Sequence, residues 1–482
     1  MSFKYKVIFL VILATFTRFI NLDWGNNLFF HPDENNMATS LSQLSESNLN
    51  PHFFAYGQFP LYLGYFSLRA LNLANNFINS VFILRFYSAL FSLLSLYFFY
   101  KIYPHLTYIL LLIFTPGLIQ LAHFGTTESL LILTFVINLY ITKLILKKPN
   151  RWYFFLASIS TGIAIATKIS GAIFALPIIF AALLTHSWYL IPYGFLSLSL
   201  GVLLSPYNLL TFHDFISTMH YETGVAIGTI PVFYTTQFSN STPYFFQLVN
   251  IFPYVNGWPI ILFACLSIPF LTIKNKKYAF IIFLSCLIYF LYFGQLYVKW
   301  TRFMSPLFFI FPLFATIFLR RYPKLLPIAL ISGILFLANY FLPDTRLLAS
   351  KYLVSSLPKN SSVLTESGNV VDIPVLPHEL NLISYDFYNY DYISLSKKLP
   401  NVEYIIIPSR RVFKNYNFNY YQHLFDGSLG FKKENIIRPW SDFFLNSENA
   451  EETWSVFDRP TIRVYKKDIN LSPNQYEKLL QE

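Results

Sequence analysis

Two adjacent carboxylates, Asp33 and Glu34, stand in the stretch FFHPDENN between Phe29 and Asn36. Three explanations fit them. Acids at the start of a helix stabilise its N-terminus by capping and through the helix dipole, and a helix that starts near Pro32 fits this explanation. Together with His31 they could form part of a metal site, which would need further ligands from elsewhere in the chain. A carboxylate could also act as a general base and accept the proton of an attacking hydroxyl.

Other charged side chains stand at the ends of apolar segments. Glu128 follows His123 by five positions, and three cations occupy similar places: Lys168, Lys299 and Arg302. Each cation has an ordinary explanation, because lysines and arginines at the ends of membrane helices extend toward the lipid headgroups. Taken together with the acids, they predict a cationic pocket that holds a lipid phosphate and neutralises it as it departs.

The composition requires a membrane to position these residues. The 482 residues are 55% hydrophobic and 20% aromatic, and only 12% are charged. Apolar stretches of about 20 residues, enough to span a bilayer, recur through the first 343 residues. The net charge of +11 is explained by lysines and arginines in loops, so nucleic-acid binding is not expected.

The sequence predicts a mainly α-helical polytopic membrane protein with about eleven spans. The first is basic and then apolar without a small-residue cleavage site, which indicates an uncleaved helix. The predicted helices are 5–22, 81–101, 104–122, 128–146, 152–168, 171–187, 189–210, 244–272, 278–298, 303–319 and 324–342.

The distribution of cations predicts the orientation of the chain. One set of helix ends is rich in lysine and arginine, which marks the cytoplasmic side. Its members are Lys4, Lys6, Lys101, Lys143, Lys147, Lys148, Arg151, Lys274, Lys276, Lys277, Arg320, Arg321 and Lys324. The N-terminus is therefore expected inside and the C-terminus outside.

Two long loops and the C-terminal tail are then expected on the outer face. In the loop 23–80, segments that mix apolar and polar residues predict amphipathic helices in the membrane interface. The second outer loop is 211–243. Residues 1–343 would form the transmembrane domain, and residues 344–482 a small extracytoplasmic α/β domain with strands in SSVLTE, VEYIIIPS and TIRVYKK.

Several short motifs occur along the chain in a recognisable order. They are R-F-I and H-P-D-E within 18–34, F-P-L-Y at 59–62, F-G-T-T-E-S at 124–129, A-T-K-I-S-G at 166–171, Y-T-T-Q-F and P-Y within 234–244, K-W-T-R-F-M-S-P at 299–306 and F-D-R-P-T-I-R-V-Y at 457–465. In order and spacing, the chain resembles the GT-C glycosyltransferase superfamily, in particular the bacterial protein O-mannosyltransferase and aminoarabinose transferase branch. The resemblance covers nearly the whole chain.

This resemblance implies roles for individual residues. Asp33 matches the acidic residue of the first loop that acts as general base, and Glu34 matches the neighbour that orients this region. Glu128 matches an acid that faces the sugar or the acceptor. The basic positions expected near the donor phosphate are Lys168, Lys299 and Arg302. Four further polar side chains are candidates for contacts with the sugar or the acceptor: His31, His123, Glu222 and Gln237.

The implied reaction is an inverting transfer of mannose or another hexose from an undecaprenyl- or dolichyl-type polyprenyl phosphate to an acceptor hydroxyl. It would take place on the outer face of the cytoplasmic membrane. The acceptor remains open between a glycan, a lipid and a protein. A protein acceptor is disfavoured because Gln58-Phe59-Pro60-Leu61 replaces the His-Pro-Pro element of the eukaryotic enzymes, and because their inserted domain is missing. No cofactor is required by this chemistry, although a divalent cation could take part, and the sequence shows no strong metal motif.

Two other functions remain open at this stage. A transporter or a flippase for lipid-linked sugars would carry charged or broken helices near the middle of the membrane. A membrane scaffold without catalysis would use its outer domain to bind a partner.

Overall fold

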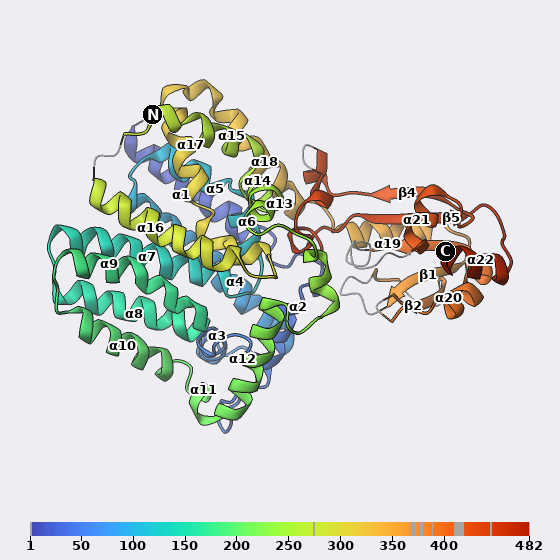
Figure 1. The fold of residues 1–482 in the computed structure, drawn as a ribbon, viewed down its shortest axis with the longest axis horizontal. Helices are drawn as coiled ribbons and strands as arrows, with labels where there is room; N and C mark the ends of the chain where they lie inside the picture. The colour runs from blue at the N-terminus through green and yellow to red at the C-terminus, as the bar shows by residue number, and fades with distance from the viewer. Residues whose placement is uncertain are drawn as a thin grey trace. The chain divides into compact units, whose positions relative to one another are not determined.

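The computed structural model describes residues 2–272, 275–367, 373–375, 379–387, 389–408, 419–443 and 446–481, so Lys274 and the last residue of VEYIIIPS lie outside the described residues. The chain divides into two compact units (Figure 1). The first comprises Met1–Asp23, Asp33–Ile230 and Thr242–Leu337. The second comprises Trp24–Pro32, Pro231–Ser241 and Ala338–Glu482.

The first unit is built from helices, many of them apolar around most of their circumference. Such helices need either a protein core or lipid on every side. In chain order they are α1 Phe3–Phe19, α2 Pro32–Ser42, α3 Phe59–Ala70, α4 Phe77–Ile102, α5 Leu106–Ile113, α6 Pro116–His123, α7 Glu128–Lys147, α8 Arg151–Thr167, η1 Ile169–Ala175, α9 Leu176–Leu184, α10 Leu190–Leu203, α11 Tyr207–Leu210, α12 Phe212–Ile227, α13 Phe245–Asn250, α14 Phe252–Asn256, α15 Trp258–Leu266, η3 Ile268–Phe270, α16 Lys276–Gly294, η4 Thr301–Leu307, α17 Ile310–Arg321, η5 Pro323–Leu325 and α18 Leu326–Leu337.

Within this unit α7 packs against α4 and α8, and α8 packs against α10 (Figure 1). The contact between α8 and α10 is close because small residues face each other. A Cβ added to Gly162 would lie 2.6 Å from Leu200 Cβ, and one added to Gly201 would lie 2.7 Å from Ile165 Cγ2. Small residues at helix interfaces are typical of membrane proteins, where close backbone approach increases van der Waals contact.

The structure confirms a multi-pass membrane protein, but not the predicted number of spans. In the described part of the chain, four helices are long and apolar enough to cross a membrane, and seven spans result if each bent pair counts as one. Three predicted single helices are broken: 104–122 bends by 56°, 244–272 by 109° and 303–319 by 48°. Hydropathy depends only on composition, so it does not indicate where a helix bends. The break at Gly257, whose φ is +84°, lies between Pro253 and Pro259.

Arg18 stabilises one of these breaks from inside the helical unit. Its side chain is fully buried, and its guanidinium donates to the carbonyls of Ile113 (2.8 Å) and Leu112 (3.0 Å) at the end of α5. It also donates to Ser92 Oγ at 2.9 Å. Carbonyls at a helix end have no intrahelical partner, so the arginine satisfies groups that the bend leaves open.

The second unit contains a five-stranded mixed sheet in the order β2-β1-β3-β5-β4. Its strands are β1 Ser362–Ser367, β2 Asn381–Asp386, β3 Tyr404–Ile407, β4 Phe431–Ile437 and β5 Ile462–Lys467. Strand β1 is parallel to β2 and β3, whereas β5 is antiparallel to β3 and β4. The strands predicted in SSVLTE, VEYIIIPS and TIRVYKK correspond to β1, β3 and β5, so the α/β character of the tail is confirmed.

Helices cover both faces of this sheet. The other elements of the second unit are η2 Phe233–Phe238, η6 Ala338–Tyr340, α19 Thr345–Ser356, α20 Tyr392–Lys398, η7 Leu399–Asn401, α21 Asn419–Asp426, η8 Trp440–Phe443, η9 Ser447–Asn449, η10 Glu452–Trp454 and α22 Pro473–Gln481. One apolar core joins the sheet to α20, α21 and α22, and a second joins it to α19.

Candidate active site

The two adjacent acids open α2, which begins at Pro32 as predicted, and the structure gives them different environments. Glu34 is completely buried. Its carboxylate accepts from Arg85 Nη2 at 2.6 Å, from Arg85 Nε at 2.8 Å and from the backbone N–H of Gly125 at 2.7 Å. Glu34 therefore joins α2, α4 and the loop before α7 through one fully hydrogen-bonded charge.

Arg85, the partner of Glu34, was not among the residues predicted from the sequence. It lies on α4, is fully buried, and also donates to the carbonyl of Leu22 at 2.7 Å. The sequence did contain a signal for Arg85, namely a lone arginine within an apolar helix. A charge in that position needs a buried partner. The sequence did not show that this partner is Glu34.

Asp33 pairs instead with Arg302, which donates from Nη1 to Asp33 Oδ2. The two side chains are 24% and 23% exposed, so the pair lies at an accessible rim. Arg302 belongs to η4, and its guanidinium lies over the Trp300 ring at 4.6 Å from the centroid. The structure thus brings together an acid and a cation that are 269 positions apart.

Lys168 lies in the turn between α8 and η1. Its ammonium is 5.2 Å from the centre of the Tyr56 ring and 5.1 Å from that of Phe303, the residue after Arg302. It is also close enough to Glu128 and Glu222 for electrostatic attraction. One cation therefore lies between two aromatic rings and interacts with two acids from α7 and α12.

The two acids around Lys168 differ in burial. Glu128 is buried at the first position of α7, where a negative charge interacts favourably with the helix dipole. Glu222 is half-buried on α12. Burial raises the pKa of the Glu222 carboxyl, and the nearby Lys168 ammonium opposes this rise.

Lys299 lies three positions before Arg302, and its side chain is buried. Its ammonium donates to the carbonyl of Tyr297 at 2.9 Å, and burial lowers its pKa. Arg302 and Lys168 are linked through two aromatic rings, because Arg302 lies over Trp300, Lys168 lies over Phe303, and these two ring centres are 5.3 Å apart. Lys299 contacts Tyr297 instead.

The structure does not bring the four candidate contact residues together. Glu222 joins the group around Lys168. His123 is fully buried, with Nδ1 at 2.7 Å from the carbonyl of Ile119 and Nε2 at 2.8 Å from that of Ile20, so both ring nitrogens have backbone partners.

His31 and Gln237 belong to the second unit. The His31 ring packs on Phe457 with 4.4 Å between ring centres. Gln237 donates to Glu451 Oε1 at 3.0 Å and accepts from the backbone N–H of Glu452 at 3.1 Å. Both side chains are thereby bound to residues of the C-terminal α/β unit.

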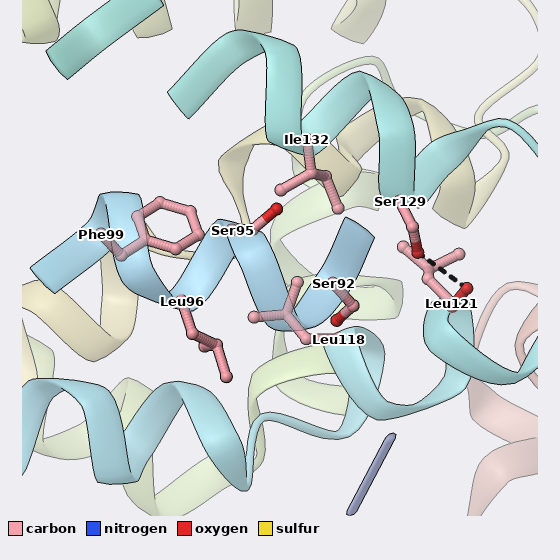
Figure 2. Close-up of a pocket in the computed structure, with 8 residues that line it drawn as sticks. All are labelled: Ser92, Ser95, Leu96, Phe99, Leu118, Leu121, Ser129 and Ile132. Carbon is pink, nitrogen blue, oxygen red and sulfur yellow. Dashed lines mark hydrogen bonds between the residues drawn. The ribbon is translucent and has the colours of Figure 1, made fainter. Parts of the chain in front are cut away.

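Among the described residues, no group of three or more His, Cys, Asp and Glu side chains could hold a metal ion. A cavity of about 10 Å³ lies between α4, α6 and α7, enough for roughly one water molecule. Its lining is shown in Figure 2 and consists of Ser92, Ser95, Leu96, Phe99, Leu118, Leu121, Ser129 and Ile132. None of these eight residues belongs to the candidate site, so this cavity is a packing feature of the helices.

Comparison with known proteins supports one class of protein. Residues 60–208 match the family model described as dolichyl-phosphate-mannose-protein mannosyltransferase. This range includes Arg85, Glu128 and Lys168 but neither Asp33 nor Arg302. No curated protein matches the sequence.

Solved structures with a similar arrangement are distant. ArnT from Cupriavidus metallidurans bound to undecaprenyl phosphate is 13% identical, with a TM-score of 0.46 and coverage of 96% of this chain and 98% of that chain. In its apo state ArnT is 14% identical, with a TM-score of 0.48 and coverage of 95% of this chain and 97% of that chain. Arabinofuranosyltransferase AftD from mycobacteria is 10% identical with a TM-score of 0.41, over 98% of this chain and 42% of that chain. At these values the likenesses carry no conclusion about activity or ligand.

Residues 60–208 therefore resemble this mannosyltransferase family, in line with the resemblance seen in the sequence, and the apolar helices fit a membrane protein.

Proposed function

We propose that the protein transfers a sugar, mannose or another hexose, from a polyprenyl phosphate to an acceptor hydroxyl. The proposed general base is Asp33. The observation that carries this proposal is the accessible pair of Asp33 and Arg302, beside a second acid, Glu34, that is buried and fully used in packing. Of the two adjacent carboxylates, only Asp33 has the exposure that a reacting group needs.

In the proposed reaction Asp33 accepts the proton of the acceptor hydroxyl while that oxygen attacks the anomeric carbon. The bond between this carbon and the phosphate oxygen breaks, and its electron pair stays with the phosphate. The leaving phosphate gains one negative charge, which nearby cations stabilise. A single displacement inverts the configuration of the sugar, and the configuration of the product tests this step.

Arg302 is proposed to serve both reaction partners. In the structure it donates to Asp33 Oδ2, so the two charged groups are bound to each other. A donor phosphate would compete for the guanidinium, because arginine can bind phosphate through two parallel hydrogen bonds. Binding of the donor would then free the base at the same time as it neutralises the leaving group. Lys168 and Lys299 are the further cations proposed for the phosphate.

The proposed setting is the outer face of the cytoplasmic membrane, with the N-terminus inside and the C-terminal unit outside. The distribution of lysines and arginines along the sequence supports this orientation. The donor lipid is an undecaprenyl or dolichyl phosphate, and the family match supports a polyprenyl-phosphate donor. The acceptor is a glycan, a lipid or a protein. No cofactor is proposed as a requirement, and a divalent cation could still assist by binding the phosphate.

The test is release of labelled sugar by membranes that contain the wild type or Asp33→Asn, supplied with a panel of polyprenyl-phosphate sugars and mixed acceptor lipids and glycans. The matched control is Asp214→Asn, which removes an exposed acid on α12 whose described partner is His213. Turnover by the wild type and the control that is lost in Asp33→Asn, with donor binding retained, is the expected result. Equal turnover in all three proteins would reject Asp33 as the base.

One observation favours a second function, a transporter or flippase for lipid-linked sugars without glycosyl transfer. The helix pair 245–266 is sharply broken, and broken helices line the binding sites of many transporters. The same assay separates the two functions, since a flippase moves the donor across the bilayer of proteoliposomes but leaves the sugar on the lipid.

A further inference from the structure

Helix α12 is unusually exposed for an element of the helical unit. Of its sixteen residues, only Gly224 and Val225 are buried. Several of its exposed side chains are large and apolar: Phe212 is 55% exposed, Ile216 47% and Ile227 52%. Such side chains are unfavourable in water when they form a continuous surface, so something covers them.

These side chains form one stripe. Phe212, Ile216, Met219 and Ile227 follow the spacing of a single helix face, and among them only the exposed Thr223 adds a polar side chain to that face. The stripe extends over about 23 Å, given a rise of 1.5 Å per residue. Polar side chains occupy the other flank, where His213 lies 3.7 Å from Asp214 and Ser217 is exposed. The helix is therefore amphipathic, with an uncovered apolar face.

The uncovered face continues an exposed apolar surface on the two preceding helices. Leu203 at the end of α10 is 69% exposed, and Leu209 and Leu210 on α11 are 58% and 70% exposed. Helices α10, α11 and α12 follow one another along one edge of the unit (Figure 1), and α11 packs against α12. An exposed apolar surface thus leads from the apolar helix α10 through α11 into α12.

We propose that α12 lies in the membrane interface, with the stripe from Phe212 to Ile227 among the acyl chains of the leaflet and its polar flank in water. The sequence predicts interfacial helices only within 23–80, so this is an additional lipid contact. The helix contains no lysine or arginine. Its binding energy therefore comes from buried apolar area, and it needs no anionic lipid.

This placement has a consequence for Glu222. The residue lies on the same helix and interacts with Lys168. An interfacial α12 holds Glu222 at headgroup depth beside that lysine, which is also the depth at which the phosphate of a lipid lies. This consequence is independent of whether sugar transfer occurs.

The test measures the environment of each face in the full-length protein, in nanodiscs of neutral phosphatidylcholine. Cys265→Ser and Cys286→Ala remove the native thiols, and single cysteines at Phe212, Ile216 or Ile227 receive nitroxide labels. Matched controls carry the label at Asp214 or Ser217 on the polar flank. Collision rates with oxygen, which concentrates in lipid, and with a neutral nickel chelate, which stays in water, are then compared.

The expected result is an oxygen-to-nickel ratio that is several-fold higher at the three stripe positions than at the two controls. Equal nickel access on both flanks would place α12 in water and overturn the proposal. Protection of the stripe from both reagents would show that protein covers it, for example a second copy of the chain, and would overturn the proposal as well. The readout needs no catalysis, so the outcome does not depend on the proposed reaction.

Discussion

Replacement of Glu34 by glutamine should destabilise the protein strongly, although the change is almost isosteric. The carboxylate is fully buried and accepts two hydrogen bonds from Arg85 and one from Gly125. Glutamine removes the negative charge and turns one acceptor into a donor, so the Arg85 guanidinium stays buried without its counter-charge. Loss of one partner of a buried ion pair costs about 3–5 kcal/mol of unfolding free energy.

A double-mutant cycle provides the measurement. Unfolding free energies of the wild type, Glu34→Gln, Arg85→Met and the double variant would be obtained in detergent by titration with a denaturing surfactant. Each single variant should lose roughly 3–5 kcal/mol, and the double variant should lose much less than the sum, since it no longer contains an isolated buried charge.

The control for this cycle is the neighbouring residue. Asp33→Asn removes an accessible ion pair, which is worth about 0–1 kcal/mol, and should leave the unfolding free energy nearly unchanged. If Glu34→Gln also lost less than about 1 kcal/mol, or if the two single effects were simply additive, the structural role assigned to Glu34 would be refuted.

Three further predictions concern other regions of the chain. Gly333→Ala should destabilise the protein by about 1–3 kcal/mol, because the new Cβ would lie 1.7 Å from the carbonyl oxygen of Phe114. Gly194 has open space around it, so Gly194→Ala should be neutral or slightly stabilising, and thermal unfolding compares the two variants. Glu222→Gln should stabilise the protein at neutral pH, because the raised pKa of the Glu222 carboxyl in the folded state means that its ionised form disfavours folding. This gain should vanish as the pH falls below the pKa of the unfolded state, and an unchanged melting temperature at pH 7 would contradict the prediction. Gln237→Ala should speed amide hydrogen exchange at Glu452, whose N–H loses its acceptor, while exchange in β1 stays constant; unaltered exchange at Glu452 would argue against this contact.

Local signals in the sequence predicted several elements well. The start of α2 at Pro32 and the start of α7 at Glu128 follow from short-range features: a proline or an acid at the first turn, followed by apolar periodicity. Short β-branched and aromatic runs likewise predicted β1, β3 and β5. These features depend on neighbours within a few positions, so the sequence displays them directly.

Features that depend on distant residues were harder to predict. Asp33 and Arg302 were both singled out, but their pairing joins positions 269 apart, and nothing in one sequence indicates such a contact. Arg85 was overlooked because its partner, Glu34, lies 51 positions away. The broken helix at 244–272 was predicted as one span because an apolar average hides a change of direction, although Pro253, Gly257 and Pro259 were visible signals.

His31 and Gln237 show a different limit of sequence reasoning. Both lie in predicted outer loops and were candidates for contacts with the sugar or the acceptor. In the structure their side chains pack on residues of the C-terminal unit, 426 positions away for His31 and 214 for Gln237. A contact of either side chain with a substrate stays a prediction.

The C-terminal unit is assembled from three separate stretches of chain, and this affects how it can be exchanged. Besides Ala338–Glu482 it contains Trp24–Pro32 and Pro231–Ser241. Phe30 lies beneath the Arg346 guanidinium at 3.5 Å from the ring centre, and Gln237 bonds to Glu451. A truncation at residue 337 would therefore leave two orphaned segments in the remaining protein. A chimera that imports a foreign C-terminal unit must import its matching loop segments as well, so natural recombination of this region as a single cassette is disfavoured.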